Sequence, residues 1–254
     1  MLKISPQNSK TKGLREVADL SAYLANRRKI FSLDLLSGHT CPGAKDCKSR
    51  VMEDVNGKRT IQDGPDCQFR CFSASQEICY PNVYNARLYN TDIVKGLKTT
   101  DQIFRMIVKS LPPNLGILRY HVGGDFFKLA YLRAAVQVAE SMPDRLFYAY
   151  TKSLHHLSRV DCVDLSQGLI RPNFLVTTSR GGKYDHLIEP LRARTATVVF
   201  AEDQTGGLPL DHDDSHAATI GGSFALLLHG VQPKGTEASK ALVQLRGRGS
   251  YGKK

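Results

Sequence analysis

Five of the six cysteines of this chain lie within a stretch of 39 residues. They form a C-x5-C pair, a C-x3-C pair and one further thiol: Cys41 and Cys47, Cys67 and Cys71, and Cys79. The N-terminus carries no apolar segment of the signal-peptide type, which indicates a protein kept in the cytoplasm. Cytoplasmic thiols stay reduced, and clustered ones more often bind metals or catalyse reactions than form disulfides. We therefore expect a metal site, with a disulfide pair as the alternative.

A predicted β-hairpin brings the two cysteine pairs together, although 20 residues separate Cys47 from Cys67. Asn56-Gly57 stands between two short extended arms, and this dipeptide is typical of a type I′ turn. A hairpin returns the chain to the point that it left, so the two pairs meet in space. The predicted metal ligands are Cys41, Cys47, Cys67 and Cys71.

The fourth ligand of this site stays open between Cys67, Cys79 and His39. A helix that follows Cys71 places Cys79 about 12 Å away along its axis. One small metal centre does not easily reach both, so we interpret Cys79 as a half-buried helix thiol. Cys162 is isolated in the sequence, and we interpret it as a core or surface thiol because free cysteine packs as a small hydrophobe.

Four thiolates can hold either zinc or an iron–sulfur cluster. Structural zinc sites usually use the tighter C-x2-C spacing, so the longer spacings favour a [4Fe–4S] cluster, with zinc as the alternative metal. If three cysteines bind, one iron stays open and can act as a Lewis acid or carry a chelating cofactor. If four bind, the cluster is closed and only transfers electrons or stabilises the fold.

Short β-branched or aromatic runs alternate with helix-like stretches along the chain. The predicted strands are 29–36, 116–122, 145–151, 173–179, 196–202 and 224–230, and the clearest helices are 72–90, 101–110 and 128–141. Strands that alternate with helices pair in parallel through right-handed crossovers. The pattern predicts an α/β fold, a full or partial (β/α) TIM-like barrel of about six parallel strands.

The same pattern gives the domain organisation. Residues 29–245 form one barrel-like domain, in which residues 38–79 are a cysteine-rich, metal-binding insertion after the first strand. Residues 1–28 are a basic N-terminal segment. Residues 246–254 contain two Gly-Arg steps and no apolar periodicity, so we expect a basic, disordered tail.

Polar residues stand at the carboxyl ends of the predicted strands, where such folds gather their reactive groups. The first strand runs directly into the cysteines, which places the thiols at the barrel mouth. The catalytic candidates at other strand ends are Asp125, Lys152 and Glu202, and Gly123 and Gly124 allow a ligand to approach the backbone closely. His121 lies inside a strand, and we interpret it as a hydrogen-bonded core histidine.

The formal net charge is +11 and the pI is about 9.4. A basic surface attracts nucleic acid and other polyanions, but no helix-turn-helix, zinc-finger or single-strand-binding signature accompanies the charge. No apolar run approaches the roughly 18–20 residues of a membrane helix, so we expect no membrane partner. The oligomeric state does not follow from the sequence.

The run FSLDLLSGHTCPGAKDC, continued by FRCFSASQE and PNVYNARLYN and later by RYHVGGDFF and YLRAAVQVAESMPDRLFYAYTKSL, resembles the bacteriophage family called gene product 88. The resemblance covers most of the chain from about residue 29 onward. It implies a phage origin and a site of action in the cytoplasm of the host. It implies no particular reaction.

A second resemblance is to radical S-adenosylmethionine proteins, which place a three-cysteine [4Fe–4S] site after the first strand of a partial barrel. Gly123-Gly124-Asp125 is similar to the glycine-rich, acidic segment that those enzymes use near the methionine amino group. Their C-x3-C-x2-C motif is absent, since Phe72-Ser73-Ala74 follows Cys71 without a third thiol. S-adenosylmethionine is therefore kept as an alternative cofactor.

The leading hypothesis is a phage-encoded [4Fe–4S] protein that acts on a small substrate as a Lewis acid or redox centre, with hydrolase-like or radical-SAM-like chemistry. The alternative is a closed-cluster or zinc-stabilised module that binds nucleic acid or a host protein through its basic surface.

Overall fold

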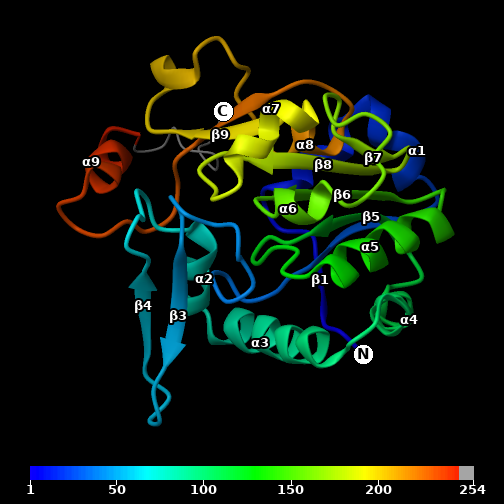
Figure 1. The fold of residues 1–254 in the computed structure, drawn as a ribbon, viewed down its shortest axis with the longest axis horizontal. Helices are drawn as coiled ribbons and strands as arrows, with labels where there is room; N and C mark the ends of the chain where they lie inside the picture. The colour runs from blue at the N-terminus through cyan, green and yellow to red at the C-terminus, as the bar shows by residue number, and fades with distance from the viewer. Residues whose placement is uncertain (246–254) are drawn as a thin grey trace.

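The structure is a computed structural model, and it describes residues 1–245. The predicted tail over 246–254 lies outside the described residues. The centre of the molecule is an eight-stranded, mostly parallel sheet (Figure 1). Its main path runs in the order β1 (Ile4–Pro6), β2 (Lys29–Leu33), β5 (Leu115–Tyr120), β6 (Leu146–Thr151), β8 (Phe174–Ser179), β9 (Thr195–Val199) and β10 (Phe224–Leu227), and β7 (Leu169–Arg171) pairs with β8.

All six predicted strands are present, and each pairs in parallel with the next predicted strand along the chain. β1 and β7 are antiparallel additions. Within residues 1–245 the sheet is open, because β1 and β10 form its two edges and do not pair with each other. The predicted α/β class is confirmed, but the closed form of the predicted barrel is not formed. Closure of the common α/β barrel takes eight parallel strands, and this sheet has six.

Two apolar cores cover the two faces of the sheet, as the alternation of side chains along a strand requires. Leu118 packs in the core that contains side chains of α4 (Thr100–Ser110) and α5 (Leu129–Ser141). Its neighbour Ile117 packs on the other face with Leu14 and Leu20. Residues 1–28 are therefore not a separate appendage: they supply an edge strand and cover one face of the sheet.

The predicted helix over 72–90 is two helices, α2 (Phe72–Cys79) and α3 (Pro81–Gly96). Tyr80 separates them with an extended backbone, because the residue before a proline is disfavoured in the helical region. The remaining short elements are η1 (Thr11–Glu16), η2 (Ala18–Leu20), α1 (Ser21–Leu24), α6 (Leu154–Leu157), η3 (Asp185–Leu187), α7 (Ile188–Leu191), η4 (Glu202–Thr205), α8 (Ser215–Ala218) and α9 (Glu237–Gln244).

The predicted hairpin is present as β3 (Ser49–Glu53) and β4 (Arg59–Asp63), and it projects from the body of the molecule (Figure 1). Its turn is not the predicted type I′, which needs positive φ at both central residues. Gly57 has φ +76°, whereas Asn56 is not among the residues with positive φ. The Asp54 carboxylate accepts hydrogen bonds from the Asn56 and Lys58 amides, both at 2.9 Å, and so stabilises a longer loop.

No helix in the described part of the chain combines the length and apolar character that crossing a membrane would require.

Candidate functional site

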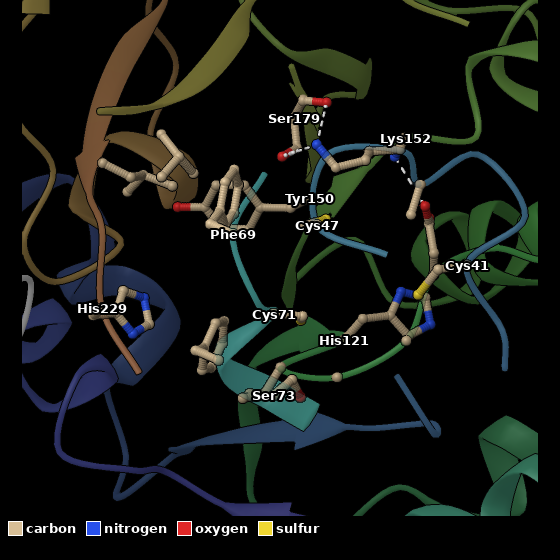
Figure 2. A pocket seen from close by; sticks show the side chains of 18 of the residues that line it. Cys41, Cys47, Phe69, Cys71, Ser73, His121, Tyr150, Lys152, Ser179 and His229 are labelled. Atoms are coloured by element: carbon tan, nitrogen blue, oxygen red, sulfur yellow. Dashed lines mark hydrogen bonds between the residues drawn. The ribbon is translucent and has the colours of Figure 1, made fainter. Parts of the chain in front are cut away.

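A cavity of about 160 Å³ lies at the carboxyl ends of the parallel strands (Figure 2). Residues at the ends of β5, β6, β8 and β10 line it, together with part of the cysteine-rich insertion and α2. The carboxyl ends of parallel strands meet at one edge of a sheet, so groups distant in the sequence converge there.

Three of the four predicted metal ligands line this cavity: Cys41, Cys47 and Cys71. Each thiol is partly exposed towards the cavity and is otherwise surrounded by protein. Burial raises the pKa of Cys71 to about 12, and the proximity of Cys47 adds to the rise. Burial also raises the pKa of Cys41, with further contributions from Asp125 and Cys71. The three sulfurs therefore share one electrostatic environment, and their thiolates require a compensating cation.

Cys67, the fourth predicted ligand, is not among the cavity-lining residues. Its Sγ lies 3.6 Å from the Ser49 hydroxyl and donates to the Phe69 carbonyl at 3.2 Å. The same Ser49 hydroxyl accepts a hydrogen bond from the Cys71 amide at 3.3 Å. Cys67 thus lies outside the cavity lining but close to it, since burial raises the pKa of Cys67 and the proximity of Asp63 and Cys47 adds to the rise.

The other two candidates for a fourth ligand are also placed elsewhere. His39 Nε2 lies 2.8 Å from the Val51 carbonyl oxygen, so this ring contacts the hairpin. Cys79 is the last residue of α2 and is exposed. Cys162 is partly buried against the core beneath α5, as expected for an isolated thiol.

The loop that carries Cys41 and Cys47 is held on the sheet edge by backbone hydrogen bonds. The amide of Asp46 donates to Gly181 O at 3.0 Å, and the amide of Lys183 donates to Gly43 O at 2.8 Å. A Cβ atom on Gly43 would lie 2.1 Å from the Lys152 carbonyl oxygen, so only glycine permits this close crossing. The two thiols are therefore positioned by tertiary contacts as well as by the hairpin.

The arrangement of the donors bears on which metal centre they could hold. Among residues 1–245, no group of three or more Cys, His, Asp or Glu side chains is arranged to hold one metal ion. With Zn–S bonds of about 2.3 Å, the sulfurs of a tetrahedral zinc site lie about 3.8 Å apart. The sulfurs that ligate a [4Fe–4S] cluster lie farther apart, since each binds a different iron. Thiolates such as those of Cys41, Cys47 and Cys71 are ligands that both zinc and iron–sulfur clusters take.

Asp125 joins the ends of β5 and β6 within the cavity wall. Its carboxylate accepts hydrogen bonds from the Thr151 hydroxyl at 2.6 Å, the Phe126 amide at 2.7 Å and the Lys152 amide at 2.9 Å. Burial raises the pKa of Asp125, and these hydrogen bonds oppose the rise. This predicted catalytic residue therefore reaches the site, where its oxygens already accept three donors.

Lys152 is buried in the same wall. Its ammonium group donates to the Ser179 hydroxyl at 2.9 Å, to the Ser179 carbonyl at 3.0 Å and to the Arg180 carbonyl (Figure 2). The positive charge of Lys152 lowers the pKa of Cys47, although burial outweighs it. Lys152 thus places a cation beside the thiols while it fixes the end of β8.

Gly123 and Gly124 line the cavity, but protein atoms explain the need for glycine. A Cβ on Gly123 would lie 2.4 Å from the Ser73 hydroxyl, and a Cβ on Gly124 would lie 2.7 Å from the Thr40 hydroxyl. The glycines therefore let α2 and the segment before Cys41 pack onto the end of β5. Packing is thus one observed reason for both glycines, and close approach of a ligand stays a prediction.

Glu202, the third catalytic candidate, is not brought to the cavity. It begins η4, is exposed, and is absent from the cavity lining. The strand before it ends at Val199, so two residues carry the chain away from the sheet edge before Glu202. His121 is buried, and its Nε2 lies 2.8 Å from the Tyr131 hydroxyl, as expected of a hydrogen-bonded histidine, but it also lines the cavity.

The cavity also has polar residues that the sequence analysis missed: Lys10, Arg119, Tyr150 and His229. Arg119 carries a signal, since it is a charged residue inside the apolar run GILRYHV. His229 carries one too, because it stands at the carboxyl end of the predicted strand 224–230. Lys10 carries none, because only the packing of residues 1–28 brings it to the cavity.

Comparison with known proteins gives one match. No curated protein and no solved structure matches the chain. The family model described as gene product 88 matches residues 2–246, which is nearly the whole chain. The similarity to radical S-adenosylmethionine proteins has no support from these comparisons. The chain therefore belongs to the bacteriophage gene product 88 family.

Proposed function

We propose that this protein binds a [4Fe–4S] cluster through Cys41, Cys47 and Cys71 and uses the open iron to act on a small substrate in the cavity. The observation that carries the proposal is the convergence of these three thiols, and not of Cys67, on one cavity. When bound, the cluster supplies a Lewis-acidic or redox-active iron. Such chemistry belongs in a reducing compartment, so we place the protein in the cytoplasm of the host cell.

The residues of the chain have separate parts in this proposal. Asp125 and Lys152 hold the ends of β5, β6 and β8 and the cysteine loop in a fixed arrangement. Phe69 and Phe72 line the cavity and exclude water from part of it. Because the Asp125 oxygens already accept three donors, we assign Asp125 a positioning role in place of the predicted catalytic one.

S-adenosylmethionine is the cofactor that we propose to test first on the open iron. The segment Gly123-Gly124-Asp125 follows β5, which pairs with β2, and the cysteine loop follows β2. Cofactor and thiols would then meet at neighbouring strand ends, in one half of an open (β/α) barrel. Under this proposal an added one-electron reductant such as dithionite would supply, through the cluster, the electron that breaks the sulfur–C5′ bond of S-adenosylmethionine. Methionine would leave, and the 5′-deoxyadenosyl radical would take a hydrogen atom from the substrate to give 5′-deoxyadenosine. If the iron-loaded protein leaves S-adenosylmethionine intact, hydrolase-like Lewis-acid chemistry becomes the proposal to pursue.

The first experiment is expression without oxygen, followed by measurement of iron, sulfide and zinc per chain and of the visible absorption. We expect about four irons and four sulfides per chain. The variants Cys41→Ser, Cys47→Ser and Cys71→Ser should lose most of the iron and the colour. The matched controls Cys67→Ser, Cys79→Ser and Cys162→Ser should retain both.

Two results would overturn the proposal. One zinc per chain without colour would make the site structural. Loss of iron in Cys67→Ser equal to that in Cys71→Ser would make the cluster closed and would favour the module that binds nucleic acid or a host protein. Circular dichroism of each variant separates loss of the ligand from loss of the fold.

A further inference from the structure

The part of the cavity wall around His229 has a different chemical character. Lys10, Arg119, Tyr150 and His229 line it, and we call these four residues the basic floor. Figure 2 shows His229 and Cys41 on opposite sides of the cavity. The remaining lining near His229 includes apolar side chains, among them Phe72, whose ring centroid lies 4.4 Å from that of His229. Charged groups in such surroundings act on a ligand with little competition from water.

The Asp214 carboxylate forms ion pairs with both cations of the basic floor, Lys10 and Arg119. Its side chain is fully buried and is not part of the cavity lining. Oδ1 lies 2.8 Å from Lys10 Nζ and accepts from the Tyr150 hydroxyl at 3.2 Å. Oδ2 accepts from Arg119 and from the Tyr148 hydroxyl. Burial alone would raise the pKa of Asp214, but Arg119 and Lys10 lower it to about 2, so the carboxylate stays ionised.

The charge of this group is therefore positive on the cavity side. Lys10 and Arg119 line the cavity and carry two formal positive charges. Asp214 and Asp211 do not line it, and the Asp211 carboxylate accepts from the Tyr150 hydroxyl at 3.4 Å, so the two acids balance the two cations in total but only the cations face the cavity. His229 adds no charge near neutral pH, because burial, Lys10 and Arg119 lower its pKa to about 3. The guanidinium of Arg119 also lies over the Tyr150 ring, 5.4 Å from its centroid, which fixes its orientation.

We infer that the basic floor binds the anionic group, a carboxylate or a phosphate, of a small-molecule ligand through Lys10 and Arg119. Arginine and lysine are the usual partners of both anions, and a cation held in place beforehand loses little freedom on binding. The inference rests on the proposed function in one respect: with its anionic group on the floor, the ligand points its other end towards Cys41, Cys47 and Cys71.

The test uses inorganic phosphate and acetate as probes, at constant ionic strength set with chloride. We expect at least one of them to raise the melting temperature of the full chain, since a ligand that binds the folded state stabilises it. Lys10→Met should weaken the apparent affinity at least tenfold. Lys12→Met, which removes the same charge from an exposed residue two positions away, should leave it unchanged.

Stabilisation by phosphate alone, by acetate alone or by both would identify the class of anion that binds. Failure of both anions to stabilise the wild-type chain, or equal weakening by Lys12→Met, would overturn the inference. If Lys10→Met does not fold, Lys10→Arg keeps the charge and must retain binding, while Lys10→Gln must lose it. Iron is measured in the same samples, so that the two proposals are tested separately. Anion binding by a protein without iron would support the anion site on the basic floor and would contradict only the proposed [4Fe–4S] cluster.

Discussion

Two histidines that line the cavity, the buried His121 and the half-buried His229, lie where their surroundings lower the pKa. His121 has φ +69°, lies next to β5 and is surrounded by Phe126 and Tyr131. Burial, assisted by the charge of Arg119, lowers the pKa of His121 to about 3. Burial lowers that of His229 to the same value, with contributions from Lys10 and Arg119. Both rings are therefore neutral in the folded state at pH values well above 3.

This arrangement predicts a loss of stability in mild acid. The pKa of His121 is about 3 in the fold and about 6.5 in the unfolded chain, so between these values the unfolded chain binds more protons. The free energy of unfolding thus falls as the pH drops below about 6.5, by at most about 1.4 kcal/mol per pH unit for each histidine. We expect His121→Asn to reduce this slope by about one proton, since asparagine tolerates positive φ.

Urea denaturation at pH 7, 6 and 5 measures the slope directly. His121→Asn also removes the hydrogen bond to Tyr131 and lowers stability at every pH, so the comparison concerns the slope and not the absolute value. If the free energy of unfolding changes with pH at the same slope in the wild type and in His121→Asn, the assignment of a neutral, buried His121 is contradicted.

Among the elements, the contact between the end of β5 and the cysteine loop matters most for the site. Gly124 has φ +94°, and a Cβ there would lie 2.7 Å from both the Leu35 Cβ and the Thr40 hydroxyl. Gly124→Ala should therefore push residues 35–40 away from β5 and destabilise the protein by about 2–4 kcal/mol. The displaced loop carries Cys41, so the iron content should fall as well.

Gly222→Ala is the matched control for this prediction. Gly222 does not have positive φ, and a Cβ there would meet no atom within 4 Å, so we expect a change within about 0.5 kcal/mol and normal iron. Chemical denaturation and iron analysis of both variants measure these effects. A Gly124→Ala protein with wild-type stability and iron would show that the contact does not position the loop.

The sequence predicted the elements that have strong local patterns. The six strands were predicted from β-branched runs, and the hairpin from Asn56-Gly57. Pro81 signals a helix break, which the prediction of one helix over 72–90 did not take into account. β1 and β7 are three residues long, which is too short for a periodic pattern. The position of His229 follows from the strand that precedes it, whereas that of Lys10 depends on how residues 1–28 pack onto the sheet, and no local propensity encodes such packing.

At the scale of the whole molecule, the formal net charge of +11 predicts salt-dependent binding to nucleic acid. A positively charged protein displaces counterions from nucleic acid, so its binding weakens steeply with salt. We expect duplex DNA of unrelated sequences to bind with similar affinity at low salt, and to lose about a thousandfold or more between roughly 50 and 200 mM salt. Electrophoretic mobility or fluorescence anisotropy measures this.

Cys71→Ser is the informative variant in that experiment. Binding that is the same in Cys71→Ser shows general polyanion attraction, separate from the proposed reaction. Binding that resists salt, prefers one sequence and disappears with the iron would support the nucleic-acid module over the enzyme.

The central claim is a cluster with three cysteine ligands and one open iron. Electron paramagnetic resonance before and after mild oxidation of the anaerobically purified protein tests it most directly, with iron counted in parallel. An iron without a cysteine ligand is the first to leave, so the account predicts loss of about one iron in four and the signal of a [3Fe–4S] cluster. Retention of every iron without that signal would show a fourth protein ligand, and the absence of iron from the anaerobic protein would contradict the account altogether.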